Sequence, residues 1–309
     1  QEDLKKSNLD PENVNIISYR PIDKRITFYT GNSKGVHCMP RPEVMQHMLR
    51  DNIALNTLRQ VKVGEDWMHA FVSNSITESC YISNKTSEIS YCFPLYLYKT
   101  EEKKKKNALQ SMMLFEPEVE YDKKGRTANI APKVFEQLEN AYKKKPTPEQ
   151  ILYYCYGILY SNGYREKYAE FLKIDFPRIP FTADYKLFLQ MARLGEELSE
   201  LHLMKHKSLN RPVAKYKGSG EDLIEKPNYD IESKTVFINK TKYFEGIESE
   251  VWNYHIGGYQ VLEKYLKDRK GRQMEDPATY CKIAMAIAET IRIQQQLNPF
   301  FSKIETSCI

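Results

Sequence analysis

The stretch "IDFPRIPF", residues 174–181, constrains the fold of this chain more than any other feature. It follows directly on "YREKYAEFLK", which is typical of the end of a helix, and another helical pattern begins just after it. Pro177 and Pro180 each fix φ, remove a backbone donor and disfavour helical geometry in the residue before them. This stretch, called the strap below, is therefore predicted to be an extended connector of fixed geometry between two helices.

The sequence on either side of the strap predicts these helices. Before it, the pattern indicates two helices divided at Ser161–Gly163, with Thr147 as the first N-cap and Pro148 in the first turn. After it, Thr182 is predicted to cap a helix that runs to about His206. The apolar residues of that helix follow a heptad spacing of 4, 3, 4 and 3: Leu187, Met191, Leu194, Leu198 and Leu201. Because the pattern is short, a core-facing helix is favoured over a coiled-coil dimer.

The chain before these helices is rich in strand patterns. "NVNIISYRPIDKRITFYTG" contains two β-rich runs around Pro21 and Asp23, which predicts a hairpin. A helix is predicted from Pro42. Further strands are predicted in "WMHAFVSNSI", "ESCYIS" and "ISYCFPLYLYK", the last containing a proline that fits only an edge strand or a bulge.

The order of these patterns predicts an α+β chain in three parts. Residues 1–145 form a β-rich lobe, in which the run "TEEKKKKN" is predicted to be a solvated loop. Residues 146–208 form a helical connector that contains the strap. Residues 209–309 form a C-terminal lobe with helices and a hairpin in "YDIESKTVFIN", whose loop is predicted at Glu232–Lys234.

Composition narrows the class of protein only slightly. A net charge of +5 and a pI near 8.6 permit a polyanionic partner without requiring one. The six cysteines show neither a CxxC pair nor regular spacing, so no disulfide framework or zinc cluster is predicted and a cytoplasmic location is expected. The longest apolar run, "ILYYCYGILY", is half of what a membrane span needs. Because the chain opens on Gln1 in a polar stretch, we expect it to be a fragment of a longer polypeptide.

Motifs for catalysis are incomplete, and no catalytic or metal-binding residue is predicted. "NPFF" at Asn298 lacks one proline of an amino-methyltransferase loop, and "GSGE" at Gly218 is not followed by a convincing dinucleotide-type helix. His202 and His206 are four residues apart, but they lack the glutamate that follows the first histidine of a metallopeptidase, which favours core or surface histidines.

A metal-dependent nuclease remains an alternative. Glu232 and Lys234 have the E-x-K spacing of nuclease sites, with Asp222 or Asp230 as the further acid. Such triplets occur by chance in many hairpin turns, so this alternative is not favoured.

Nucleic-acid binding is a second hypothesis. Arg, Lys and Tyr are interleaved in "YRPIDKRITFYTGNSKG", and arginine and lysine neutralise phosphates while arginine also binds guanine edges. An ordinary strand pair with a basic face accounts for the same residues, and composition does not decide between the two.

Four longer stretches carry a family resemblance: "YRPIDKRITFY", "FPLYLY", "YCYGILYSNGYREKYAEFLKIDFPRIPF" and "VWNYHIGGYQVLEKYLKDRKGR". Together they resemble the C-terminal specificity region of type ISP restriction-modification enzymes and related single-chain adenine-N6 DNA methyltransferases. The resemblance implies a non-catalytic target-recognition module that binds double-stranded DNA. It also implies a methyltransferase domain in the same polypeptide that uses S-adenosylmethionine, with ATP and Mg²⁺ required if a motor and nuclease are present. The strap would then close the recognition domain and lead into a spacer helix.

Under this resemblance, Arg20, Lys24 and Arg25 are the first candidates for DNA contacts, near the junction with the methyltransferase. Strand alternation predicts that Lys24 and Arg25 point to opposite faces. Further candidates lie on loops of the β-rich lobe: Lys34, His37, Arg41, Asn74, Ser75, Lys85 and Thr86. The basic run "KDRKGR" at Lys267 is better explained by the end of a helix, where positive charge complements the helix dipole. A structural scaffold that docks the motor or methyltransferase without touching DNA remains a further alternative.

Overall fold

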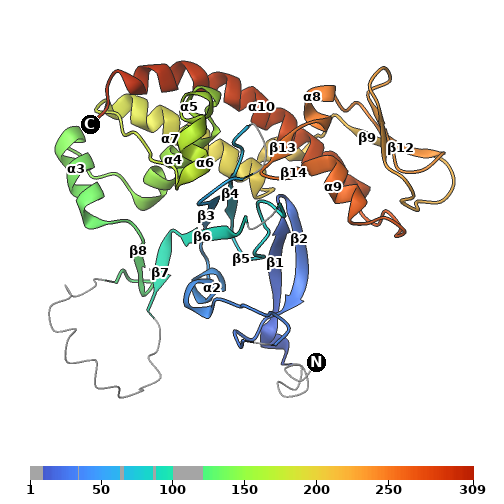
Figure 1. Ribbon diagram of the computed structural model, residues 1–309, viewed down its shortest axis with the longest axis horizontal. Coiled ribbons are helices and arrows are strands. Elements are labelled where there is room, and N and C mark those ends of the chain that lie inside the picture. The colour runs from blue at the N-terminus through green and yellow to red at the C-terminus, as the bar shows by residue number, and fades with distance from the viewer. Residues whose placement is uncertain (1–9, 34, 63–65, 86–87, 100–120) are drawn as a thin grey trace.

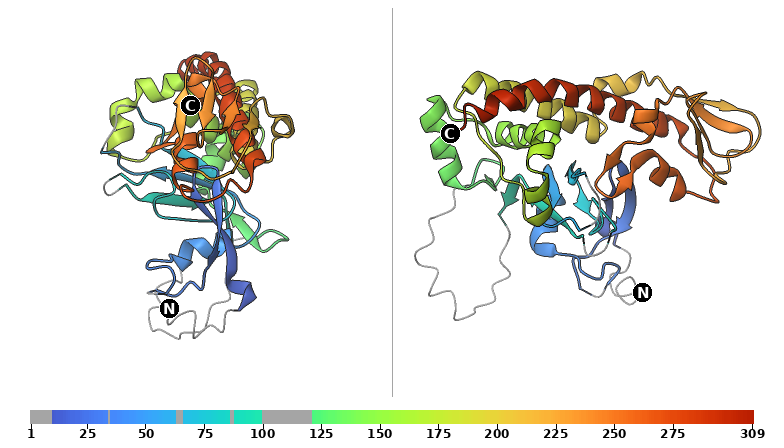
Figure 2. Two further views of the ribbon diagram at one scale, coloured as in Figure 1. Left: turned by 90° about the vertical axis from the view of Figure 1, so that its right-hand side faces the viewer. Right: turned by 45° about the horizontal axis from the view of Figure 1, so that its top comes forward.

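The computed structural model describes residues 10–33, 35–62, 66–85, 88–99 and 121–309 (Figure 1). Helices and small sheets are mixed along the chain, which confirms the predicted α+β class. Figure 2 shows the longest helix running along one side of the molecule, with the β-rich lobe beneath it and the C-terminal sheet beyond one of its ends.

The chain begins with a short 3-10 helix, η1 (Pro11–Asn13), and then forms the predicted hairpin from β1 (Val14–Arg20) and β2 (Asp23–Phe28). Strand β5 (Ile76–Thr77) adds to β1 in parallel, so β2 lies at the edge of this three-stranded sheet. Helix α2 (Pro42–Met48) begins at the predicted proline.

A second sheet of three strands has β3 (Ala54–Leu58) at its centre, between β4 (Ala70–Ser73) and β6 (Ser90–Pro94). Pro94 ends the edge strand β6, as its missing backbone donor requires.

The strand predicted in "ESCYIS" is wrong, because residues 78–83 form turns and bends. The carboxylate of Glu78 accepts a hydrogen bond from the backbone N–H of Cys80, and the carbonyl of Glu78 accepts one from the N–H of Tyr81. Local side-chain and turn bonds therefore replace a strand ladder here.

Strands β7 (Tyr96–Tyr98) and β8 (Arg126–Ala128) form an antiparallel pair before helix α3 (Pro132–Tyr142). Residues 126–128 pair with β7, so α3 begins only at Pro132. The run "TEEKKKKN" between the two strands, residues 100–107, lies outside the described residues.

Helices α4 (Pro148–Tyr160) and α5 (Asn162–Lys167) divide at Ser161 as predicted, and α6 (Ala169–Ile174) follows after a further break. The hydroxyl of Thr147 caps α4 in a complete capping box with Gln150.

Helix α7 (Tyr185–His202) follows the strap, and its predicted limits need correction. The N-cap is Asp184 and not Thr182, because the Asp184 carboxylate accepts bonds from the N–H groups of Lys186 and Leu187. The helix ends four residues earlier than predicted, close to Met204, whose φ is +62°.

The C-terminal part begins with the 3-10 helix η3 (Lys207–Asn210) and carries a four-stranded antiparallel sheet in the order β10-β11-β12-β9. Its elements are β9 (Lys215–Gly218), β10 (Asn228–Asp230), β11 (Thr235–Phe237), β12 (Lys242–Glu245), α8 (Ser249–Trp252), β13 (His255–Ile256), β14 (Tyr259–Gln260), α9 (Val261–Lys267) and α10 (Pro277–Glu305). The β10–β11 hairpin and its turn at residues 232–234 are those predicted.

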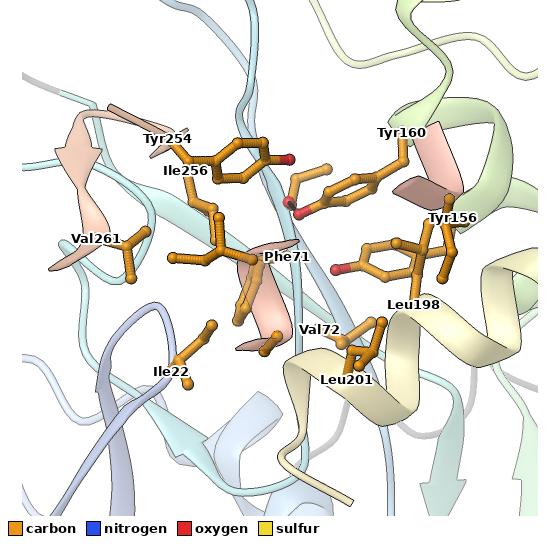
Figure 3. Packing of buried hydrophobic residues seen from close by; sticks show 14 of the residues in the cluster. Ile22, Phe71, Val72, Tyr156, Tyr160, Leu198, Leu201, Tyr254, Ile256 and Val261 are labelled. Carbon is orange, nitrogen blue, oxygen red and sulfur yellow. Dashed lines mark hydrogen bonds between the residues drawn. The ribbon is translucent and has the colours of Figure 1, made fainter. Parts of the chain in front are cut away.

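The five heptad residues of α7 are all buried, which confirms the prediction of a core-facing helix. Helix α7 packs closely on α4, because a Cβ at Gly195 would lie 1.8 Å from the carbonyl oxygen of Tyr153. Figure 3 shows Phe71 and Val72 of β4 between this helix pair and side chains from the C-terminal part. All three predicted parts thus contribute to one core, and the division between them stays a prediction. Among the described residues, no helix is long and apolar enough to cross a membrane.

Candidate nucleic-acid interface

The strap runs extended, and its backbone carbonyls are bound by tyrosine hydroxyls from the preceding helices. Tyr154 on α4 donates a hydrogen bond to the carbonyl oxygen of Pro180 at 2.7 Å. Tyr164 on α5 donates one to that of Arg178 at 2.8 Å. Both tyrosine side chains are buried, so the strap is held by neutral, partly buried hydrogen bonds.

The strap also contacts the β-rich lobe and the residues that follow α10. The ring of Phe176 meets the rings of Tyr91 and Phe93 on β6 edge-on, with centroids 5.1 and 5.5 Å apart. At its other end, the carbonyl oxygen of Phe181 accepts a hydrogen bond from the N–H of Ile309 at 2.8 Å. The strap therefore connects the β-rich lobe, helices α4 and α5, and the residues that follow α10.

The tip of the β1–β2 hairpin is fixed by one buried carboxylate. Asp23 is 4% exposed and binds both terminal nitrogens of Arg269, with N–O distances of 2.8 and 3.2 Å. Arg25 Nη2 lies 3.2 Å from the same carboxylate. A buried carboxylate needs such charged partners to offset its lost hydration. This cluster joins the hairpin to the residues that follow α9.

Arg20 and Arg25 lie against the ring of Tyr19. Their guanidinium carbons are 3.9 and 3.7 Å from the ring centroid, within the range of cation–π contacts. Arg20 also binds the carboxylate of Glu78 and the carbonyl oxygen of Tyr19, and its side chain is only 12% exposed. These two predicted DNA contacts are thus already engaged within the chain.

Lys24 differs from both arginines. It is exposed, and its ammonium donates a hydrogen bond to Asn74 Oδ1 at 2.6 Å. No carboxylate of a described residue forms an ion pair with it. Although the residue as a whole is exposed, partial burial of its ammonium group and the like charge of Lys205 lower the pKa of Lys24. As strand alternation predicts, Lys24 and Arg25 have different neighbours.

Two other candidates lie near Lys24. Asn74 accepts its hydrogen bond, and Ser75 is buried with its hydroxyl 2.8 Å from that of Ser18 on β1. Ser75 therefore fastens the loop after β4 to the hairpin, and Asn74 lies at the more accessible position beside it.

The remaining candidates are dispersed over the β-rich lobe. His37 Nε2 lies 2.9 Å from Thr27 Oγ1 of β2, which brings this loop to the hairpin. Arg41 is exposed at the start of α2, and Lys85 is exposed in the loop before β6. Lys34 and Thr86 lie outside the described residues.

Sequence reasoning missed the residues that hold the hairpin tip. Asp23 and Arg269 are 246 positions apart, and Glu78 and Lys205 belong to segments for which no motif was evident. Only the difference between Lys24 and Arg25 could be predicted, because strand alternation can be read from neighbouring residues of the sequence.

The nuclease candidates have other partners. Asp230 accepts bonds from the N–H groups of Glu232 and Ser233, at 3.0 and 3.4 Å, and so closes the β10–β11 turn. Lys234 binds Glu248 at 2.8 Å. Asp222 lies 3.1 Å from the ammonium of Lys242 on β12. In the described parts of the chain, no three His, Cys, Asp or Glu residues are grouped so as to hold a metal ion.

The incomplete methyltransferase motifs also have structural roles. Asn298 lies inside α10, where its Oδ1 accepts a bond from the N–H of Asn162 at 3.1 Å. Gly218 ends β9, and a Cβ there would lie 1.9 Å from the carbonyl oxygen of Thr241. These residues therefore do not fit a site for S-adenosylmethionine.

His202 has a structural role as well. It is buried between the hydroxyls of Tyr156 and Thr290, at 2.6 and 2.9 Å, as expected for a core histidine. His206 is the N-cap residue of η3, and its ring nitrogen Nδ1 accepts a hydrogen bond from the N–H of Ser208.

Comparison with known proteins assigns the family of this chain. The family described as "Type ISP C-terminal specificity domain" matches residues 1–295, so this chain belongs to that family. No match was found among curated proteins.

Three solved structures share the fold. The DrdV–DNA complex, solved by cryoEM, has a TM-score of 0.69 and 20% identity. The Type ISP restriction-modification enzyme LlaBIII bound to DNA has a TM-score of 0.66 and 17% identity, and a nuclease-deletion mutant of the enzyme LlaGI with a DNA substrate mimic has 0.63 and 18%. The match to DrdV covers 93% of this chain and 28% of that chain. The match to LlaBIII covers 92% and 18%, and the match to LlaGI covers 93% and 25%.

Proposed function

We propose that this chain is the DNA target-recognition module of a larger restriction-modification enzyme. The match of the specificity-domain family to residues 1–295 carries the proposal. The three structural neighbours are described as DNA complexes, and this chain has the length of only one part of them. In this role the module selects the site and a catalytic domain of the same polypeptide acts there.

The proposed chemistry of the parent enzyme is methylation of adenine N6. The methyltransferase domain would bind S-adenosylmethionine and extrude the target adenine from the duplex, and this module would fix the register of the enzyme on the DNA. ATP and Mg²⁺ would be needed only by a parent that also carries a motor and a nuclease. The expected location is the cytoplasm, where the DNA of a bacterial cell lies.

Within the module, we place Lys24 first among the candidate DNA contacts. Arg20 and Arg25 are held by Glu78 and Asp23, whereas Lys24 forms no ion pair with a described residue. The positive charges of Lys24 and Lys205 repel each other. A phosphate bound between the two lysines would relieve this repulsion. Asn74, released from Lys24, offers an amide of the kind that binds adenine edges or the backbone.

The full-length enzyme and duplex DNA provide the test. We expect Lys24→Ala to weaken binding to all sequences alike and to reduce the slope of log K against log salt by about one unit, because one phosphate contact is lost. Lys234→Ala is the matched control, since Lys234 lies in the other hairpin and is paired with Glu248. It should leave the slope unchanged.

Two results would count against these assignments separately. A full-length enzyme that binds every duplex equally would contradict the proposed function. A normal sequence preference combined with an unchanged slope for Lys24→Ala would move the phosphate contact to another residue and leave the function intact.

A further inference from the structure

The loop between β5 and β6 carries one of the predicted DNA contacts and is anchored more firmly than its exposed position requires. Its described residues are 78–85 and 88–89, and we call it the Glu88 loop. Lys85 is exposed on it and forms no ion pair with a described residue. Two sets of contacts fix the loop: those of a buried carboxylate within it, and those of a turn from the C-terminal part that lies against it.

The buried carboxylate is that of Glu88, which is 4% exposed. It accepts hydrogen bonds from the hydroxyl of Ser83 at 2.5 Å and from the N–H of Lys62 at 2.9 Å. His69 Nε2 lies 4.0 Å from it, but burial lowers the pKa of His69 to about 4, so this ring is neutral at pH 7. Burial of a carboxylate among neutral groups costs hydration energy. The two hydrogen bonds offset this cost only while the loop keeps its position.

The contacts of Glu88 also fix the backbone at two lysines. The N–H of Lys62 binds the carboxylate directly. The N–H of Lys85 donates to Ser83 Oγ at 3.2 Å, and the carbonyl oxygen of Lys85 accepts a bond from the N–H of Glu88 at 3.1 Å. Both lysines are exposed, and neither forms an ion pair with a described residue. Two unpaired lysines on backbone segments that meet at Glu88 supply the positive charge that phosphate contacts need.

The β13–β14 turn brings the C-terminal part against this loop. The N–H of Gly257 donates to the carbonyl oxygen of Met68 at 2.7 Å, and that of Gly258 donates to the carbonyl oxygen of Ile82 at 3.1 Å. A Cβ at Gly257 would lie 2.0 Å from the oxygen of Ile82, and a Cβ at Gly258 would lie 2.5 Å from Ser83 Oγ. The two backbones approach this closely only because both turn residues are glycine.

The residues on either side of the turn hold it in place. Ile256 is 1% exposed and lies beside Phe71 of β4 in Figure 3. Tyr259 is 3% exposed, and its hydroxyl donates to the carbonyl oxygen of Cys80 in the Glu88 loop at 2.7 Å. Because the turn is part of the core and the loop is bonded to the turn, the position of the loop depends on the C-terminal part as well as on its own strands.

We propose that Lys62 and Lys85 contact the DNA backbone and that Gly258 is a positioning residue for this contact. The inference rests on the proposed function, and it adds a contact on a different loop from that of Lys24. Binding residues work best on loops that a rigid scaffold positions, which the buried carboxylate and the glycine turn provide here. Gly258 acts through Ser83, whose hydroxyl binds both Glu88 and the N–H of Lys85.

The salt dependence of binding to duplex DNA by the full-length enzyme tests the inference. Lys62→Ala and Lys85→Ala should each lower the slope of log K against log salt by about one unit, and Lys85→Arg should keep the wild-type slope. Gly258→Ala removes no charge. We expect it to lower the slope by about one unit as well, because its Cβ displaces Ser83 and with it Lys85. A glycine that only stabilised the fold would leave the slope unchanged, since the slope counts phosphate contacts.

Two matched controls accompany these variants. Gly157→Ala creates a similar crowding elsewhere, because its Cβ would lie 2.7 Å from Met191 Sδ between α4 and α7. It should lower the free energy of unfolding without changing the slope. Lys240→Ala removes an exposed lysine of the C-terminal sheet that forms no ion pair with a described residue, and it should also leave the slope unchanged. If circular dichroism shows that Gly258→Ala does not fold, Ser83→Ala takes its place, because it removes the same hydroxyl bonds and adds no atom.

The other outcomes overturn the inference. An unchanged slope for either lysine variant overturns the contact assigned to that lysine. Lowered slopes for both lysine variants with an unchanged slope for Gly258→Ala, or for Ser83→Ala in its place, overturn the positioning role. A lowered slope for either control shows that the effect is not specific to this loop, which overturns both assignments. The sequence preference of the wild-type enzyme is measured in parallel. Its absence contradicts the proposed function, whereas a clear preference with unchanged slopes contradicts this inference alone.

Discussion

The β1–β2 hairpin and the strap are both short segments held by side chains from distant parts of the chain, but the chemistry of the two attachments differs. The hairpin tip is held by charge, through Asp23 with Arg25 and Arg269. The strap is held by the neutral hydroxyls of Tyr154 and Tyr164. The comparison teaches that the charged residues of this hairpin serve largely to anchor it, so charge content alone does not identify the DNA-binding surface.

The two attachments predict different sensitivities. Removing one partner from a charged cluster with a buried carboxylate strongly destabilises the fold, because the remaining buried charge is left without an opposite charge. A neutral hydrogen bond contributes less, and its loss costs about 1 kcal/mol. Substitutions in the two regions should separate these cases.

The largest effect is expected at Asp23. We expect Asp23→Asn to lower the free energy of unfolding by about 3 kcal/mol, at the low end for breaking a buried pair because both arginines are partly exposed. Chemical denaturation of the protein measures this. Asp230→Asn, in the exposed turn of the other hairpin, serves as the control and should cost about 1 kcal/mol or less. Equal losses at both positions would refute the distinction between the hairpins.

The neutral core around His202 predicts a pH dependence. Burial, together with the charge of Arg165, lowers the pKa of His202 to about 3, whereas an unfolded histidine titrates near 6.5. Below pH 6.5 the unfolded chain binds a proton that the folded protein does not, so stability falls as the pH falls toward 3. From pH 6.5 to 5, His202 alone should account for roughly 1.6 kcal/mol.

Unfolding free energies of the wild type and His202→Gln across this pH range test the assignment. Whatever its stability at neutral pH, the variant should lose stability less steeply, by about 1.4 kcal/mol for each pH unit. Identical slopes would mean that His202 is not held neutral in the core.

The strap itself should matter more for function than for stability. Replacing Pro177 and Pro180 together by glycine should cost about 1–2 kcal/mol through the freedom gained by the unfolded chain. In the full-length enzyme, DNA affinity should fall by more than this loss predicts, because the recognition lobe is no longer held at a fixed angle. Wild-type affinity and methylation rate in the double variant would reduce the strap to a simple linker.

The sequence was sufficient for features that depend on local chemistry. The extended strap, the N-cap at Thr147, the buried heptad face of α7 and both hairpins follow from backbone and side-chain preferences within a few residues. The turn at Glu78 and the strand β8 were missed, because a carboxylate bond to a backbone N–H and a pairing across more than twenty residues are not visible in a periodicity.

The candidate site was less predictable, for a related physical reason. Whether an arginine is available to DNA depends on its ion-pair partners, and Glu78 and Arg269 come from remote segments. The family resemblance supplied the proposed role, but it did not distinguish Lys24 from Arg20 and Arg25. That distinction needed the tertiary structure.

A smaller effect is expected from a single hydroxyl at the strap. The Tyr154 hydroxyl donates to the Pro180 carbonyl and accepts a bond from the N–H of Thr182 at 3.2 Å. Tyr154→Phe should therefore lower the unfolding free energy by about 1–1.5 kcal/mol. Tyr185→Phe is a matched control, since its hydroxyl forms no hydrogen bond with a described residue. A loss as large as that of Asp23→Asn would show that the two attachments do not differ as argued.

The smallest effect is expected at Glu232, where the β10–β11 hairpin provides a third case for the comparison. Its side chain is exposed, and Asp230 and Lys234, which a nuclease site would share with it, already bind the turn and Glu248. Glu232→Ala should change stability by less than about 0.5 kcal/mol and leave every activity of the full-length enzyme within a few-fold. A lost metal ligand would instead abolish cleavage. Selective loss of DNA cleavage, with methylation and folding intact, would show that this hairpin carries chemistry and would restore the nuclease alternative.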